Sequence, residues 1–195
     1  MAGKLKVYAQ CGKEFMMNHK TGKKAAAIVA GAVLFFLTGR FVLIEGLAGA
    51  GDLSAQFGIL AFIAALSGPV AGALAGLAGQ MLIDISFGWG IWWDTAVSAA
   101  CFGLLAGVFT GNLKLHKGQF GLKSIVVFNA AQICAHAISW GIICPALKVL
   151  IYAQPAGDSF RNGLSLGIVP IITTALIGTI LCMVYAGSQL SESVV

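Results

Sequence analysis

Charged residues are scarce in this chain of 195 residues. They make up 10% of the sequence, whereas hydrophobic residues make up 58%, and the mean hydropathy is +0.91. A soluble domain of this length needs more charge to cover its surface. The composition therefore predicts an all-α integral membrane protein with a single membrane domain, most of whose apolar surface faces lipid.

The sequence also lacks the motifs of common catalytic and nucleotide-hydrolysing sites. It contains no His-Glu-x-x-His pair, no P-loop and no Gly-x-Ser-x-Gly elbow. Without a P-loop the chain cannot drive transport by hydrolysing ATP on its own. We therefore expect a binding protein with no cofactor of its own rather than an enzyme. Two alternatives stay open: a membrane-embedded enzyme or accessory subunit that uses Asp84 and His136 as acid and base, and a stand-alone carrier.

Paired cysteines and basic aromatic stripes are missing as well. The cysteines form no CxxC pair and no metal-ligand spacing, so we interpret them as small buried hydrophobes and expect no metal: Cys11, Cys101, Cys134, Cys144 and Cys182. No stripe interleaves aromatic with basic residues, which argues against a nucleic-acid surface.

Long apolar runs are what the sequence does have. A membrane-spanning helix needs about 20 apolar residues, and six segments approach this length: 25–44, 56–67, 69–87, 92–111, 122–152 and 160–187. The second is short, Pro145 predicts a break or an outer segment within the fifth, and Pro170 predicts a kink in the last. The chain is thus divided into a basic arm (1–24), a six-helix membrane domain (25–188) and a short tail (189–195).

The lysines indicate how the bundle is oriented. Six lie in the N-terminal arm, and Lys114, Lys117 and Lys123 lie in or beside the loop 112–121. With six spans both groups fall on one side, which the positive-inside rule makes cytoplasmic. We therefore expect a multi-pass protein of the cell membrane with both termini in the cytoplasm; Lys148, on the opposite side, is an exception.

The third span carries glycine at every fourth position, at Gly68, Gly72 and Gly76, and the next two steps of four are Gln80 and Asp84. Small residues four apart let helices touch backbone to backbone in lipid. A carboxylate in an apolar span is costly and indicates a functional site.

Polar and aromatic side chains from four spans reach a similar depth, if each helical residue rises about 1.5 Å. They predict a substrate-binding pocket that opens outwards, with these candidates: Arg40, Gln80, Asp84, Trp92, Trp93, Asp94, Asn129, Gln132, His136 and Trp140. Other interpretations of single members stay open. The tryptophans could form an interface belt, Arg40 and Asp84 a structural ion pair, and His136 a hydrogen-bonded interior residue.

The first span has small residues four apart near its cytoplasmic end, at Ala26 and Ala30. Two interpretations are open. The pair could pack within the bundle, or it could present a close-fitting surface to a partner protein.

These features together resemble a known family. The order is a basic arm, Ala-x-x-x-Ala in the first span, a polar loop, a short second span, Ser-Gly-Pro-Val-Ala-Gly-x-x-x-Gly-x-x-Gly-Gln-x-x-x-Asp and Trp-Trp. It is similar to the S components of energy-coupling factor (ECF) transporters, and most similar to the riboflavin-type subgroup. The likeness covers residues 23–110. The chain departs from the subgroup at Gln80, where histidine is usual.

The resemblance implies a six-helix, high-affinity vitamin-binding subunit. Its partners would be a transmembrane ECF scaffold and two ATPase subunits, which hydrolyse the ATP. Ala26 and Ala30 would dock on the scaffold, and the loop 46–55 would close over the substrate. The subgroup favours riboflavin, and tryptophans suit a flat heteroaromatic ring. Thiamine, a queuosine precursor or folate are the other ligands that the family suggests.

Overall fold

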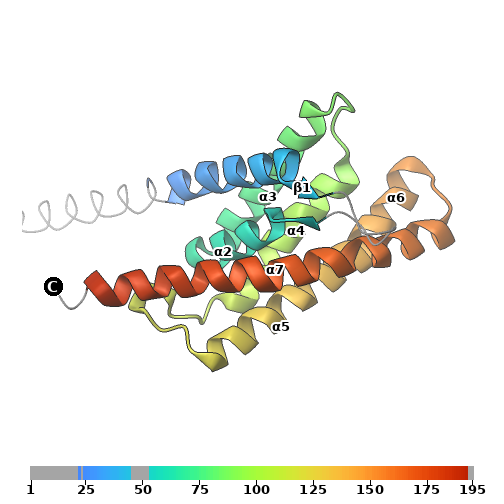
Figure 1. Ribbon diagram of the computed structural model, residues 1–195. Helices are drawn as coiled ribbons and strands as arrows, with labels where there is room; N and C mark the ends of the chain where they lie inside the picture. Colours follow the sequence, from blue (N-terminus) through green and yellow to red (C-terminus); the bar gives the residue numbers. More distant parts are fainter. Residues whose placement is uncertain (1–21, 23, 45–52, 193–195) are drawn as a thin grey trace, which may run out of the picture.

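The computed structural model describes Gly22, residues 24–44 and residues 53–192, and these form a helical bundle (Figure 1). In chain order the elements are the N-terminal helix Lys24–Phe41, β1 (Leu43–Ile44), β2 (Leu53–Ser54), α2 (Gln56–Ser67), α3 (Pro69–Ser86), α4 (Trp93–Thr110), η1 (Leu115–Lys117), α5 (Leu122–Ile138), η2 (Ser139–Ile143), α6 (Cys144–Tyr152) and α7 (Ala156–Glu192). The predicted all-α, six-helix membrane bundle is confirmed.

Within the described residues, five helical segments are long and apolar enough to cross a membrane, with Leu122–Tyr152 counted as one segment. The exception is α2, whose 12 residues span only about 18 Å, against a hydrocarbon core of roughly 30 Å. It nevertheless returns the chain across the bundle. At one end β1 pairs with β2 in an antiparallel ribbon; at the other, the carbonyl of Leu66 accepts a hydrogen bond from His116 Nε2, at 3.0 Å.

The first span ends earlier than predicted. Its helix stops at Phe41, and Leu43–Ile44 forms a strand whose backbone pairs with Leu53–Ser54. The pairing satisfies backbone groups that the helix would otherwise have bonded. Of the predicted loop 46–55, residues 46–52 lie outside the described part of the chain.

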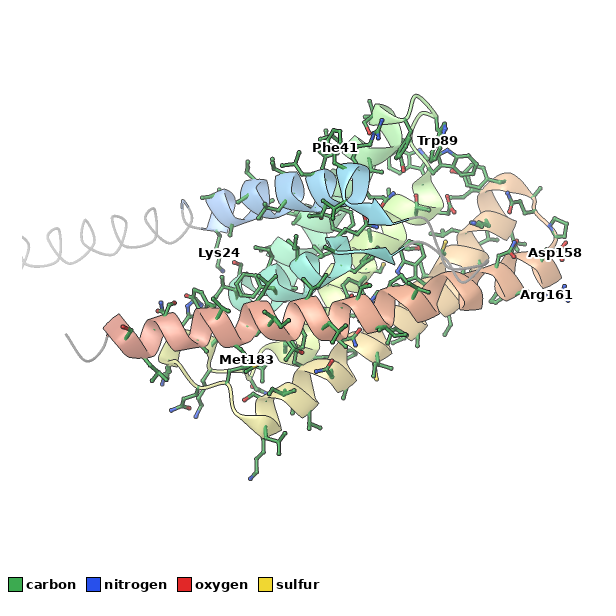
Figure 2. The ribbon with its side chains drawn as sticks, in the orientation of Figure 1. Lys24, Phe41, Trp89, Asp158, Arg161 and Met183 are labelled. Atoms are coloured by element: carbon green, nitrogen blue, oxygen red, sulfur yellow. The ribbon has the colours of Figure 1, made fainter. Side chains whose placement is uncertain are left out.

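The two ends of the bundle differ in their side chains. Lys24 and the last turns of α7 lie at the same end (Figures 1 and 2), and η1 joins them because His116 also bonds Tyr185 of α7. We call this the lysine end. Trp89, Asp158 and Arg161 lie at the opposite end (Figure 2), which we call the tryptophan end.

The glycine row of α3 packs against α4 inside the bundle. A Cβ atom added to Gly72 would lie 2.5 Å from the carbonyl oxygen of Gly103, and one added to Gly76 would lie 2.5 Å from that of Ala99. The two backbones are therefore in direct contact. This close approach holds the start of α4 beside the end of α3, where the polar candidates lie.

The core is centred on the ring of Phe57 in α2. Phe35 of the N-terminal helix and Phe102 of α4 meet it edge-on, each with a centroid separation of 5.3 Å. All three side chains are buried. Edge-to-face contact is a preferred aromatic geometry, so three helices are fixed around one ring.

The predicted break at Pro145 does not occur. Leu122–Tyr152 is one continuous helical segment, because the π-helical turn η2 comes just before the proline. Proline has no N–H and its ring clashes with the carbonyl four residues earlier in a regular α-helix. A π turn bonds to the carbonyl five residues earlier, which relieves this conflict. α7 likewise continues through Pro170.

Candidate functional site

Asp84, near the end of α3, is buried and fully engaged by protein donors. Gln80 Nε2 donates to Oδ1 at 2.9 Å, and the backbone N–H of Trp92 donates to Oδ2 at 3.0 Å. The hydroxyl of Thr95 lies 3.5 Å from Oδ2. Because Trp92 immediately precedes α4, the carboxylate ties the start of α4 to α3. Asp84 and Gln80, both predicted to contact substrate, thus bond to each other in an arrangement that positions α4.

Asp94, in the first turn of α4, has a different environment. Its side chain is fully buried. Oδ2 lies 3.8 Å from the ammonium of Lys148 and 3.7 Å from Cys144 Sγ, both in α6. Oδ1 has no hydrogen-bond partner among the described residues. A buried carboxylate with one free oxygen is a strong acceptor, since burial without a full set of donors is costly.

The predicted polar face of α5 and η2 points into the bundle. Gln132, His136, Ser139 and Trp140 are all buried. Gln132 Nε2 donates to the carbonyl of Ile171 at 3.3 Å, and His136 Nε2 lies 3.2 Å from Thr174 Oγ1, both in α7.

These four side chains retain unused hydrogen-bonding capacity. In the described part of the chain no partner is present for Gln132 Oε1, His136 Nδ1, Ser139 Oγ or Trp140 Nε1. An unmet buried polar group costs about 1–3 kcal/mol, and most buried polar groups have a partner. One row of side chains therefore offers a polar ligand an imidazole nitrogen that donates or accepts, an indole N–H donor, an amide oxygen acceptor and a hydroxyl.

Aromatic rings flank this polar row. The His136 ring lies 4.3 Å from that of Phe102 and 5.4 Å from that of Phe57, measured between centroids, and Trp140 lies 5.4 Å from Phe57. We call Asp94, Gln132, His136, Ser139 and Trp140 the inner polar row. Apolar walls with a few polar groups are typical of small-molecule sites.

Two candidates lie apart from the row. The Arg40 guanidinium sits over the rings of Phe87, at 4.2 Å, and Phe41, at 5.4 Å, so the ion pair with Asp84 that the sequence left open does not form. Asn129 lies nearer the lysine end, and its Nδ2 donates to the carbonyl of Ile125 at 2.9 Å and to Thr179 Oγ1 at 3.0 Å.

The tryptophans of the 89–93 turn line the tryptophan end. Trp92 and Trp93 are partly exposed, and the N–H of Trp93 donates to the hydroxyl of Tyr152 at 3.0 Å. An open groove of about 340 Å³ is lined by Trp89, Trp92 and Thr95. This position suits interface aromatics as well as the rim of a pocket.

Sequence reasoning missed Lys148, which appeared only as an exception to the lysine distribution. Its position follows from the burial pattern. Ser139 and Trp140 are buried, and five residues later, across the π turn, Cys144 and Pro145 are buried too. Lys148 follows Cys144 by four and so shares this inward face. The spacing of four that links Trp140, Cys144 and Lys148 is the signal in the sequence that could have found it.

The two alanines of the N-terminal helix point away from the bundle. Ala26 and Ala30 are both exposed, whereas a Cβ atom on the neighbouring Gly31 would lie 3.1 Å from Ala75 and from Ile63. Gly31 thus provides the internal contact, and the alanine pair leaves a smooth outer face.

Residues 20–187 match the family model described as "ECF-type riboflavin transporter, S component". The chain is 36% identical over 170 residues to a UPF0397 protein of Staphylococcus aureus strain Newman, covering 87% of this chain and 92% of that protein. UPF0397 proteins of strains USA300 / TCH1516 and MRSA252 match with the same identity and coverage. No solved structure matches. This match over most of the chain shows that it belongs to the S components of ECF-type riboflavin transporters, which are substrate-binding subunits and not enzymes.

Proposed function

We propose that this protein captures riboflavin from outside the cell, between α4, the α5–η2–α6 segment and α7. The inner polar row carries this proposal, because each of its five side chains has one buried oxygen or nitrogen atom without a hydrogen-bond partner in the described structure. The isoalloxazine ring of a flavin is flat and carries donors and acceptors along one edge. The row offers such groups beside Phe57, Phe102 and Trp140, which suit a planar ring.

The charge distribution supports entry from the tryptophan end. Lys24 lies at the lysine end (Figure 2), and Lys114 and Lys117 lie beside and within η1, which His116 joins to α7 at the same end. The positive-inside rule favours this end as cytoplasmic. The tryptophan end would then face outwards, with both termini inside. β1 pairs with β2 at the tryptophan end, and the loop 46–55, most of which lies outside the described residues, would close over a ligand there.

Energy for uptake would come from partner subunits. We propose that the exposed Ala26–Ala30 face docks on the ECF transmembrane scaffold, which carries two ATPase subunits. Small side chains allow close helix contact in lipid, and the exposure of both alanines leaves them free for this contact.

Titration of the purified, detergent-solubilised protein with riboflavin tests the site, with flavin fluorescence as the readout. Gln132→Leu and His136→Phe keep the side-chain volume but remove polar atoms. Losing a neutral hydrogen bond costs about 0.5–1.5 kcal/mol, so each variant should bind riboflavin about 2- to 12-fold more weakly. Cys134→Ala, on the exposed side of α5, is the control and should bind like the parent.

A parent protein that binds thiamine, folate or a queuosine precursor but no flavin would refute the riboflavin assignment. Normal riboflavin affinity in both α5 variants would instead place the pocket elsewhere.

A further inference from the structure

Asp94, which is buried, and Lys148, which is partly exposed, join α4 to α6 by a long contact. The ammonium lies 3.8 Å from Asp94 Oδ2, at the long end of an ion-pair contact, and the side chain of Lys148 is 19% exposed. A lysine ammonium has three donors, so donors are left over. Asp94 Oδ1 is also without a partner among the described residues.

The pair therefore offers an acceptor on α4, Asp94 Oδ1, and a donor on α6, Lys148 Nζ, which contacts the other oxygen of the same carboxylate. Asp94 Oδ1 accepts only, and the remaining hydrogens of Lys148 Nζ donate only. The chemical group that complements both is an N–H directly beside a C=O. That edge occurs in cyclic imides and lactams, including the pyrimidinedione end of a flavin.

We infer that Asp94 and Lys148 are the specificity-determining residues of this subunit, and that they select ligands with an imide or lactam edge. The inference rests on the proposed function and adds the substrate class. Asp94 takes the ring N–H, and Lys148 donates to the adjacent carbonyl. A ligand with an alkyl group on that nitrogen loses the hydrogen bond to a charged acceptor.

A second feature favours a ligand role over a purely structural one. A carboxylate that serves only to hold α4 in place is already present at Asp84, where both oxygens accept hydrogen bonds. Asp94 has the contrasting pattern, with one oxygen facing α6 and the other left free. Charged hydrogen bonds are the stronger and more selective ones.

The test compares riboflavin with 3-methylriboflavin, in which the imide N–H is replaced by N–CH₃. The purified full chain should prefer riboflavin by about 10- to 150-fold, the equivalent of one hydrogen bond to a charged group. The double variant Asp94→Leu/Lys148→Met removes both charges, so neither is left buried alone, and such replacements are often well tolerated. It should bind riboflavin at least 10-fold more weakly and lose the preference.

Asp158→Asn serves as the control, because it removes an exposed carboxylate at the same end of the bundle and should keep both the affinity and the preference. A parent that binds both flavins equally overturns the inference without touching the proposed function. So does a double variant that keeps the full preference. A parent that binds neither flavin overturns the proposed function and this inference with it.

Discussion

At the scale of single residues, the two buried carboxylates towards the tryptophan end differ in what surrounds them. Both oxygens of Asp84 accept from protein donors, whereas Asp94 faces a lysine with one oxygen and has no described partner for the other. Lys148 is the exception to the lysine distribution, and its contact with Asp94 accounts for a cation at the tryptophan end.

Replacing Asp84 should show whether its carboxylate positions α4 or contacts the ligand. In Asp84→Asn the amide can still accept from Trp92 N–H, and Gln80 can flip its own amide to match, so we expect little change in stability. Asp84→Leu leaves the Gln80 and Trp92 donors unpaired and should lower the free energy of unfolding by about 1–3 kcal/mol. Thermal unfolding in detergent measures this. A loss of riboflavin affinity in Asp84→Asn at unchanged stability would show ligand contact instead.

At the scale of elements, the sequence predicts what depends on local composition. The bounds of α3 and α4 agree with the apolar runs to within a residue at each end. The glycine row of α3 was also visible in the sequence. Ala99, Gly103 and Gly107 of α4 repeat with the same spacing of four, but that spacing alone did not identify them as the surface that packs against the row. The extra residue in the π turn η2 could not be predicted from the sequence, because it depends on how the folded helix accommodates Pro145.

A bulky residue in the α3–α4 contact should be severely destabilising. In Gly72→Val the new side chain would meet the backbone of Gly103, which cannot move aside as a flexible side chain can. Overpacking typically costs about 1–3 kcal/mol, and the displaced start of α4 should also weaken ligand binding. Gly187→Ala is the matched control: an added Cβ meets no atom of the described structure within 4 Å, and alanine favours helix. If Gly72→Val melts at the parental temperature, the close contact is incorrect.

At the scale of the whole molecule, the bundle separates two tasks by position. The inner polar row is buried on the first turn of α4, the second half of α5 and η2, and the exposed alanine pair follows Lys24, which lies at the lysine end (Figure 2). The sequence predicted the six passes and the gathering of polar groups. It did not resolve which of those groups are satisfied by the protein itself, because that depends on contacts between residues far apart in the chain.

The separation makes the docking proposal testable. Ala26→Trp combined with Ala30→Trp adds bulk to exposed positions, so riboflavin affinity and melting temperature should stay at parental values. Uptake by cells that carry the ECF scaffold and ATPases should be abolished, since large side chains hold helices apart. Leu176→Trp, exposed on α7, controls for added bulk and should leave uptake intact. Loss of binding together with uptake would mean that the alanines pack the bundle.

The π turn also affects how related chains should be compared. Between Trp140 and Cys144 the turn holds one residue more than a regular α-helical turn. Each residue after the turn therefore faces the direction that a regular α-helix would give to the residue one position earlier. A relative with an uninterrupted α-helix here would need its cation one position earlier to meet the same carboxylate. A one-residue gap placed within Ser139–Ile143 would align the two cations, whereas an ungapped comparison would suggest that the pair had been lost.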